Sequence, residues 1–200
     1  MRGVEQVPWA YDTLLTLSEW AGLAAWRRWL TGGARGRTLD VGCGTGRNLP
    51  LFPPGVRAVG MDPHSQNLAR ARRRAPRALL VQARAEALPF RSGSFDTVVS
   101  GLVLCSVREP RESLAEVRRV LAPGGSLRAM EHVRSTNRLR ARIQDWVQPA
   151  WTVLTGGCHP NRDTERCVEE AGFAIDGDGR RARDEMRRFQ ARPSAAPRSP

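Results

Sequence analysis

The sequence predicts an α/β fold, in which helices cover both faces of an open, mostly parallel sheet. Short apolar runs alternate along the chain with longer segments of helical periodicity, and this alternation is typical of parallel strands joined by helical crossovers. A glycine-rich loop follows the first of these runs. The length of 200 residues fits one domain, because single domains typically have about 50–250 residues.

The individual elements follow in order from these patterns. Leucine and tryptophan recur near helical spacing over residues 11–30, and two glycines end this helical segment. Five apolar runs then predict strands at 37–41, 56–61, 78–82, 95–100 and 126–132, with a turn at 123–125. Helices are expected from residue 48, over 65–75, over 110–121, over 136–154 with an interruption around Pro149, and over 161–171 with Asn161 as the N-cap.

The end of the chain is harder to assign. A short strand is expected at 173–175, but the arginine-rich segment after it shows no evident closing strand. We therefore expect the last edge of the sheet to be incomplete or replaced by a helix. The predicted organisation is an N-terminal helical lid over residues 1–33, a ligand-binding domain over 34–191, and a disordered tail over 192–200, which is poor in apolar side chains.

The charge of the chain is unusual. It carries 32 basic and 20 acidic residues, a formal net charge of +12, and every basic residue is an arginine. The absence of lysine excludes Schiff-base enzymes and phosphate loops that need a lysine. Arginines gather at 70–77 and 134–142 and could bind phosphates. Neither cluster is interleaved with exposed aromatic residues, so solvated helix faces are the better interpretation and nucleic acid is not an expected partner.

The cysteines are far apart in the sequence. None of the four forms a C-x-x-C pair: Cys43, Cys105, Cys158 and Cys167. This spacing argues against a disulfide scaffold and against a metal site, and Cys105 is expected in the core. No apolar stretch approaches the ~20 residues of a membrane span, and the first residues lead into no apolar signal core. The expected location is cytoplasmic.

The candidate ligand site begins at the glycine loop, LDVGCGTG at 39–46. Alternating glycines let backbone N–H groups approach a ligand at the carboxyl end of a central strand. Asp62 follows the second predicted strand, 20 residues after Gly42, where an acid accepts the hydroxyls of a ribose. A dinucleotide is disfavoured, because Arg47 replaces the third glycine of its fingerprint and Asp40 would repel a diphosphate. Asp40 suits an ammonium group instead. A nucleoside joined to an amino acid without phosphate describes S-adenosylmethionine.

Further motifs follow the glycine loop in a fixed order. The stretches LDVGCGTGRNL, VGMDPHS, AEALPF, FDTVVS, LVLCSV, RRVLAPGGSL and MEHV cover residues 39–133. Together they resemble the class I S-adenosylmethionine-dependent methyltransferases of the type 11 subgroup. The narrower succession LVLCSV, MEHV, DWVQPAW and GGCHPNRDT resembles the animal membrane-associated alkyl-thiol methyltransferases and their bacterial relatives, up to about Phe173. The resemblance implies a Rossmann-like fold, S-adenosylmethionine as the cofactor, and methyl transfer to a small-molecule acceptor, for which the subgroup suggests a thiol.

The resemblance also assigns cofactor contacts to particular residues. The resemblance places Asp62 at the ribose and Ser100 at the reacting sulfur, and it places Met61, Ala85 and Glu86 at the adenine. The methionine end is assigned to residues of the glycine loop and the acid before it: Asp40, Gly42, Cys43, Gly44 and Gly46. Many relatives have an aspartate just before Ala85, where this chain has Arg84. Because an arginine cannot accept from the adenine amino group, that contact is expected from backbone or from Glu86.

The candidate catalytic residue is His132, at the carboxyl end of the fifth predicted strand. A proton acceptor helps methyl transfer to a thiol, although a histidine that is merely packed at a strand end is an equally weighted interpretation. Glu131 is expected to pair with an arginine, and His159 to shape a loop. Two other functions stay open: methylation of a quinone-like carbon or a hydroxyl, and RNA binding by a basic protein with a vestigial cofactor site.

Overall fold

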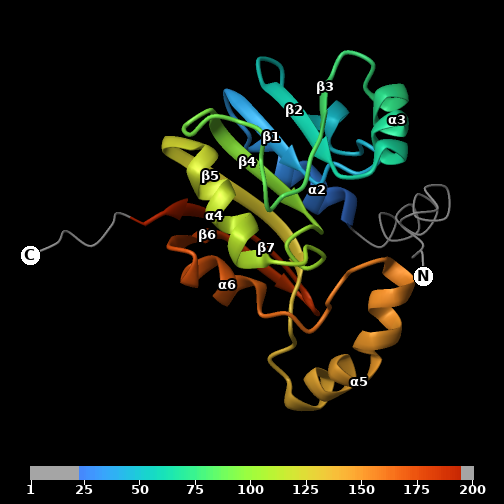
Figure 1. The fold of residues 1–200 in the computed structure, drawn as a ribbon. Coiled ribbons are helices and arrows are strands. Elements are labelled where there is room, and N and C mark those ends of the chain that lie inside the picture. Colours follow the sequence, from blue (N-terminus) through green and yellow to red (C-terminus); the bar gives the residue numbers. More distant parts are fainter. Residues whose placement is uncertain (1–22, 195–200) are drawn as a thin grey trace, which may run out of the picture.

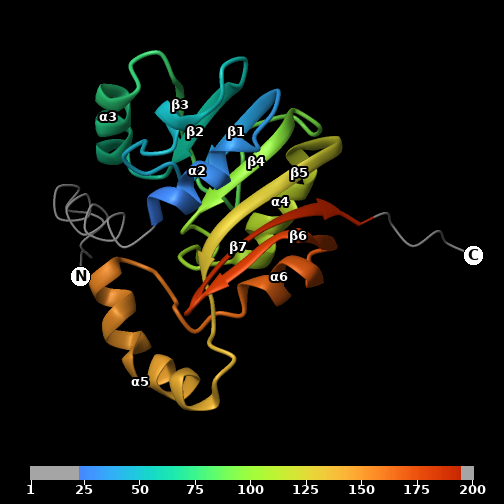
Figure 2. The ribbon, with the colours of Figure 1, turned by 180° about the vertical axis from the view of Figure 1, so that it is seen from behind.

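The computed structural model describes residues 23–194, which form a seven-stranded sheet with helices on both faces (Figures 1 and 2). The strand order is β3-β2-β1-β4-β5-β7-β6. The first five strands pair in parallel, and β7 runs antiparallel to both of its neighbours. The α/β class and the open, mostly parallel sheet predicted from the sequence are confirmed.

The strands lie close to their predicted positions. They are β1 (Arg37–Val41), β2 (Arg57–Asp62), β3 (Leu79–Gln82), β4 (Phe95–Gly101), β5 (Leu121–His132), β6 (Phe173–Arg183) and β7 (Met186–Pro193). The turn predicted at 123–125 lies inside β5, opposite a register shift in β4 between Phe95 and Thr97. The winding of the sheet reverses between β1 and β4. In open sheets of this kind, the carboxyl ends beside that reversal form the ligand crevice.

Helices cover the two faces of the sheet separately. They are α2 (Ala24–Gly32), the 3-10 turn η3 (Leu49–Leu51), α3 (Ser65–Arg74), α4 (Pro110–Val120), α5 (Arg138–Thr155) and α6 (Thr164–Glu170). Neighbouring side chains of a strand point to opposite faces, and Val98 and Val99 of β4 accordingly belong to different apolar clusters. Val98 shares its cluster with Leu114 of α4, and Val99 with Leu30 of α2. Figures 1 and 2 show α2 on one face and α4 with α6 on the other.

The expectation of an incomplete last edge is wrong. β6 and β7 form an antiparallel pair, and β7 lies between β5 and β6. Phe189 and Ala191 of β7 are fully buried, and Arg187 is only 9% exposed. An arginine can bury its aliphatic stem at a strand position while its guanidinium keeps polar partners. Buried and less buried side chains therefore alternate along β7, but a search for alternating apolar residues does not detect this pattern.

The ends of the chain also differ from their predictions. β7 continues to Pro193, and the Ser194 amide donates to the Gly172 carbonyl at 2.8 Å, so the folded domain extends beyond residue 191. The remaining tail, 195–200, lies outside the described residues. So does most of the predicted lid, residues 1–22. Its last part, α2, packs on β4 and β5 and belongs to the body of the domain.

Two helices differ in detail from the sequence prediction. α5 continues through Pro149, although a proline inside a helix removes one intrahelical hydrogen bond. α6 is capped by Asp163, whose carboxylate accepts from the Arg166 amide at 3.3 Å. The predicted cap, Asn161, donates instead to Asp145 at 2.9 Å. None of the described helices is both long and apolar enough to cross a membrane.

Candidate active site

A cavity of about 440 Å³ opens where β1, β2, β4 and β5 end. Two groups of residues line it. One comprises residues predicted to hold the cofactor, and we call it the cofactor group: Gly42, Gly44, Met61, Asp62, Ala85 and Glu86. The other, which we call the acceptor group, comes from the loop after β4, the end of β5, and the segment from α5 to α6: Cys105, His132, Trp151 and Cys158. Leu23 also lines the cavity.

Asp62 connects the end of β2 to the glycine loop. Its Oδ2 accepts from the Gly44 amide at 3.0 Å, and its Oδ1 accepts from the His64 amide at 2.9 Å and from Asn67 Nδ2 at 3.1 Å. Gly44 has φ +54°, and a Cβ added there would meet no atom within 4 Å. The backbone at Gly44 therefore borders open space. Because a carboxylate offers about four lone-pair sites and three are occupied, Asp62 keeps about one site, on Oδ2, for a ribose hydroxyl.

The other residues assigned around the loop divide between packing positions and the cavity wall. A Cβ on Gly46 would lie 2.8 Å from the Cα of Ala71, so this glycine allows α3 to pack against the loop. Gly42 lines the cavity, as does the fully buried Met61. Cys43 is buried and is not among the residues that line the cavity. Burial raises the pKa of the Cys43 thiol, which disfavours its reactive thiolate form.

Asp40 lies beneath the cavity rather than in its wall. It is fully buried, and its Oδ1 accepts from Asn48 Nδ2 at 2.8 Å. Its Oδ2 has no hydrogen-bond partner among the described residues. Burial raises the pKa of Asp40 to about 7, against the opposing effects of the Asn48 hydrogen bond and the charge of Arg27. A buried carboxylate oxygen without a partner is costly, and a cationic donor above the loop would relieve that cost.

The loop at 84–90 forms another wall. Ala85 and Glu86 line the cavity, and Glu86 pairs with Arg84 at 3.5 Å. The arginine that replaces the usual aspartate is thus held by the residue next to Ala85. Two residues of α4 fix the loop from behind. Arg119 donates to the carbonyls at positions 88 and 90, at 2.9 and 2.7 Å, and Glu116 accepts from the amide at 88 at 2.8 Å.

Ser100 and Glu131 have different roles from those predicted. Ser100 is buried and is not among the cavity-lining residues, and its hydroxyl donates to Glu131 Oε1 at 2.6 Å. Glu131 also accepts from the amides of Val103 and Cys105, at 3.1 and 3.2 Å, in place of the predicted arginine. Its carboxylate thus holds the loop after β4. The sequence signal for this role is an acid at the end of an otherwise apolar strand, in MEHV.

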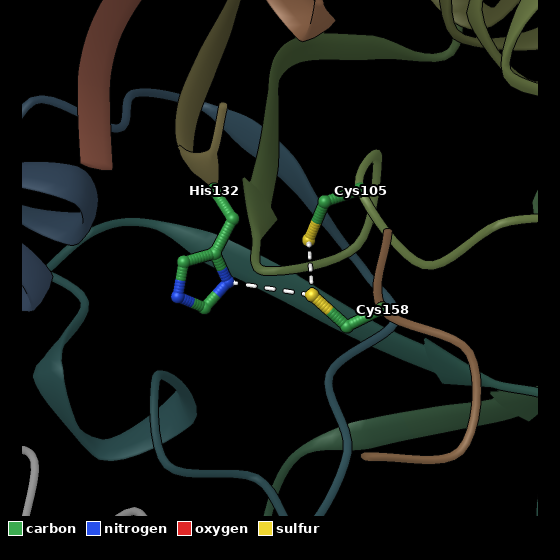
Figure 3. A group of neighbouring side chains, drawn as sticks. All are labelled: Cys105, His132 and Cys158. Carbon is green, nitrogen blue, oxygen red and sulfur yellow. Dashed lines mark hydrogen bonds between the residues drawn. The ribbon is translucent and has the colours of Figure 1, made fainter. Parts of the chain in front are cut away.

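Three side chains of the acceptor group point toward one another (Figure 3). Cys158 Sγ lies 3.7 Å from Cys105 Sγ and 3.5 Å from His132 Nδ1. The ligand atoms of all three lie within 4.8 Å of one another. The His132 ring also packs edge-on against Trp151, with 6.4 Å between ring centroids. Cys105 is buried, as predicted for a core residue, yet it also lines the cavity.

The contacts within this group shift its pKa values in different directions. The hydrogen bond between the two thiols lowers the pKa of Cys158 and raises that of Cys105. Burial opposes the charged form of His132, but Cys105 and the carboxylates of Glu131 and Glu185 outweigh it and raise the pKa of the imidazole. His132 therefore holds a proton more readily than a free histidine.

Two polar residues near the cavity shape loops, as predicted for His159. The His159 amide donates to the Cys105 carbonyl at 2.8 Å, and its ring lies 3.1 Å from Gln148. Arg162 donates to the carbonyls of Leu104 and Val107, at 2.6 and 2.9 Å. The loop after β4 is therefore held on one side by Glu131 and on the other by the segment before α6.

Comparison with known proteins identifies the central part of the chain. Residues 39–129 match the family model described as a methyltransferase domain. The chain contains a methyltransferase domain. Thiol S-methyltransferase TMT1B of Homo sapiens is 38% identical over 152 residues, which cover 71% of this chain and 62% of that protein. Demethylmenaquinone methyltransferase of Renibacterium salmoninarum is 40% identical over 92 residues, 46% of this chain and 39% of that protein.

The fold agrees with this identification. A SAM-dependent methyltransferase of Thermotoga maritima has a TM-score of 0.73 and 20% sequence identity to this chain, and the match covers 96% of this chain and 98% of the Thermotoga chain. The predicted Rossmann-like fold and the predicted resemblance to S-adenosylmethionine-dependent methyltransferases are confirmed. The chain spans 59–62% of the length of the TMT1B relatives of Rattus norvegicus and Homo sapiens.

Proposed function

We propose that this protein transfers the methyl group of S-adenosylmethionine to a small-molecule thiol. The observation that carries the proposal is a single cavity lined by both Gly44 with Asp62 and by His132. Relatives named thiol S-methyltransferases are 36–38% identical to this chain over 144–152 residues, which supports a thiol as the acceptor.

The cofactor group fits S-adenosylmethionine. Asp40 offers a buried carboxylate oxygen without a partner for the ammonium of the methionine moiety, and open space borders Gly44. Asp62 would accept a ribose hydroxyl, and Met61 with Ala85 and Glu86 would border the adenine, since all four line the cavity. When bound, the cofactor supplies a methyl group on a sulfonium, a good leaving group.

The protein's own residues would act by positioning and by proton transfer. Catalysis by alignment of two reactants is worth up to ~7–11 kcal/mol in ideal cases. Leu102 and Trp151 provide apolar walls for an acceptor. A free thiol with a pKa of ~8.5 is only a few per cent ionised at neutral pH. His132, whose ring lines the cavity beside these walls, is the candidate acceptor for this proton.

Calorimetry with S-adenosylmethionine tests the cofactor site. Asp62→Asn should weaken binding about 10–100-fold, because hydrogen bonds to charged groups contribute ~1.5–3 kcal/mol. Asp178→Asn, which changes an exposed acid on β6, is the matched control and should bind as the wild type does. Absence of binding by the wild type, or equal binding by Asp62→Asn, would refute the cofactor site.

A methyl-transfer screen across alkyl thiols, phenols and quinols tests the acceptor. Turnover should be found with the thiols. The similarity to a demethylmenaquinone methyltransferase favours a ring carbon as the second candidate, and turnover with quinols alone would establish it in place of the thiol.

RNA binding is the less supported alternative. Several arginines of the 70–77 cluster bind the protein itself: Arg72 donates to the carbonyls of Pro76 and Ala78, and Arg74 donates to Thr45. Steeply salt-dependent RNA binding without cofactor affinity would favour this function. The cytoplasmic location is likewise a proposal, supported by four free cysteines, since reduced thiols are typical of reducing compartments. Fractionation of cells that express the full protein tests it.

A further inference from the structure

Cys105, His132 and Cys158 come from three separate segments and converge at the wall of the cavity (Figure 3). Cys105 follows β4, His132 ends β5, and Cys158 follows α5. Proton transfer by His132 explains neither why two thiols lie beside the imidazole nor why all three face one another. Two sulfur atoms and one imidazole nitrogen are a ligand set that soft and borderline metal ions prefer.

We propose that Cys105, His132 and Cys158 bind a Zn²⁺ ion, and that its fourth coordination position opens into the cavity and takes the acceptor thiol as a thiolate. The metal site rests on the three side chains alone. The thiol at the fourth position rests in addition on the proposed methyl transfer.

The distances between the ligand atoms match a tetrahedral zinc site. With Zn–S of ~2.3 Å and Zn–N of ~2.0–2.1 Å, tetrahedral angles place two sulfurs about 3.8 Å apart and a sulfur and a nitrogen about 3.5 Å apart. The observed distances are 3.7 Å between the two sulfurs and 3.5 Å between Cys158 Sγ and His132 Nδ1. The third pair lies within 4.8 Å, so a modest rotation of one side chain completes the site.

The backbone around the ligands is already fixed. Glu131 accepts from the Cys105 amide at 3.2 Å, and the Cys105 carbonyl accepts from the His159 amide at 2.8 Å. The Cys158 carbonyl accepts from Thr152 Oγ1 at 2.9 Å. These contacts hold in place the two backbone segments that carry the cysteines. The same contacts join the loop after β4 to the segment after α5.

Three protein ligands with an open fourth position are typical of catalytic rather than structural zinc. Two thiolates balance the charge of Zn²⁺, which makes the ion tolerable in a largely buried place. Because Cys105, His132 and Cys158 all line the cavity, the free position faces the space available to an acceptor.

The chemistry balances without an oxidant or reductant. An acceptor thiol replaces a metal-bound hydroxide: the Zn–S bond forms, the Zn–O bond breaks, and the thiol proton leaves with the hydroxide as water. The bound sulfur then gives an electron pair to the methyl carbon. The new S–C bond forms as the bond between that carbon and the sulfonium breaks, with its electron pair remaining on the departing sulfur. In this scheme His132 is a metal ligand and does not take the thiol proton.

The metal site is tested on the full chain, purified under reducing conditions. We expect about one zinc per chain by elemental analysis. After exchange for Co²⁺, we expect the charge-transfer absorption that thiolate ligands produce. Zinc at far less than one per chain, a cobalt spectrum without thiolate bands, or a Cys105–Cys158 disulfide in its place would each overturn the proposal.

Serine variants assign the ligands. Cys105→Ser and Cys158→Ser should each lose metal affinity by more than the 10–100-fold expected for an outer-shell partner. Cys167→Ser, which removes a half-buried thiol on α6, is the matched control and should keep the zinc. Calorimetry with S-adenosylmethionine shows whether each variant is folded. Equal zinc content in all three variants would overturn the assignment, and the cobalt spectrum of the wild type tests the site even if a variant does not fold.

The role of the fourth position has its own readout. Alkyl thiols added to the cobalt protein should shift the charge-transfer band, and removal of the metal should abolish thiol methylation while leaving S-adenosylmethionine binding unchanged. Full turnover by the metal-free protein would overturn the role of zinc and leave the proposed function standing. A protein that binds zinc but not S-adenosylmethionine would refute the proposed function and leave the metal site standing.

Discussion

The buried carboxyl group of Asp40 should make the free energy of unfolding depend on pH. Burial raises the pKa of this carboxyl group from 3.8 to about 7 in the folded protein, whereas the unfolded chain keeps the ordinary value. Below about pH 3.8, both states carry the proton. Between that pH and about 7, the folded state holds a proton that the unfolded state has lost, so the free energy of unfolding falls as the pH rises. Above about 7, the contribution is constant at its lowest.

The size of this effect follows from the shift. About three pH units at ~1.36 kcal/mol per unit correspond to roughly 4 kcal/mol. Asp40→Asn should remove the effect, because an amide keeps an acceptor oxygen for Asn48 and does not ionise. The comparison with this variant is necessary, because other carboxylates with lowered pKa values, such as Glu116 beside Arg119, change stability with pH in the opposite direction.

The assay is urea unfolding of the wild type and Asp40→Asn without cofactor, at intervals from pH 4.5 to 8. The variant should gain about 3–4 kcal/mol relative to the wild type across this range. The affinity of the wild type for S-adenosylmethionine should also rise about tenfold from pH 6 to 7.5, because an ammonium group favours the ionised carboxylate. This affinity should be nearly independent of pH in the variant. A stability difference that changes by less than about 1 kcal/mol would refute the reasoning.

Three further predictions concern the walls of the cavity. Gly44→Ala should lower the free energy of unfolding by only about 1–2 kcal/mol, because of the positive φ at this position, but it should reduce cofactor affinity. Gly46→Ala, whose Cβ would meet Ala71, should lose more stability in urea unfolding. The reverse order of stability losses would contradict the roles assigned to these glycines. Glu131→Gln should cost about 1–3 kcal/mol, because its amide group can satisfy fewer of the buried donors, and it should slow methyl transfer more than it weakens cofactor binding by calorimetry. Arg119→Met should loosen the loop at 84–90 and weaken cofactor binding several-fold, and unchanged affinity would show that this loop does not contact the cofactor.

The cofactor group was predictable because its residues lie within short segments. The glycine loop and Asp62 follow directly from two apolar strands, and parallel pairing of β1 with β2 brings these ends together. What the sequence could not provide is which member of a motif faces the ligand. Ser100 and Glu131 lie at neighbouring strand ends, and only the pairing of these strands shows that the Ser100 hydroxyl donates to the Glu131 carboxylate.

The start of β6 lies at the short strand predicted over 173–175, but the closing strand β7 was missed for a different reason. Sequence periodicity detects strands by apolar side chains on alternate positions, but this chain places arginine at many half-buried positions. Arg187 and Arg128 are almost fully buried, and Arg128 stacks on Trp29 at 4.1 Å while its Nε donates to the Leu30 carbonyl at 2.9 Å. In a chain without lysine, such arginines serve as packing residues as well as surface charges, and a count of charges overstates how much of the net +12 is available to a partner.

The acceptor group shows the limit of sequence reasoning most clearly. Cys105, His132 and Cys158 are separated by 26 to 53 positions, a spacing that gives no metal motif, and they meet because β4 and β5 are neighbours and the segment after α5 returns to their ends. Cofactor binding depends on local turns that many related folds share. The position of the acceptor group depends on where the chain returns to the sheet after the long helix α5. A likeness in fold at 20% identity concerns the fold alone, so the chemistry of the acceptor must be tested on Cys105, His132 and Cys158 themselves.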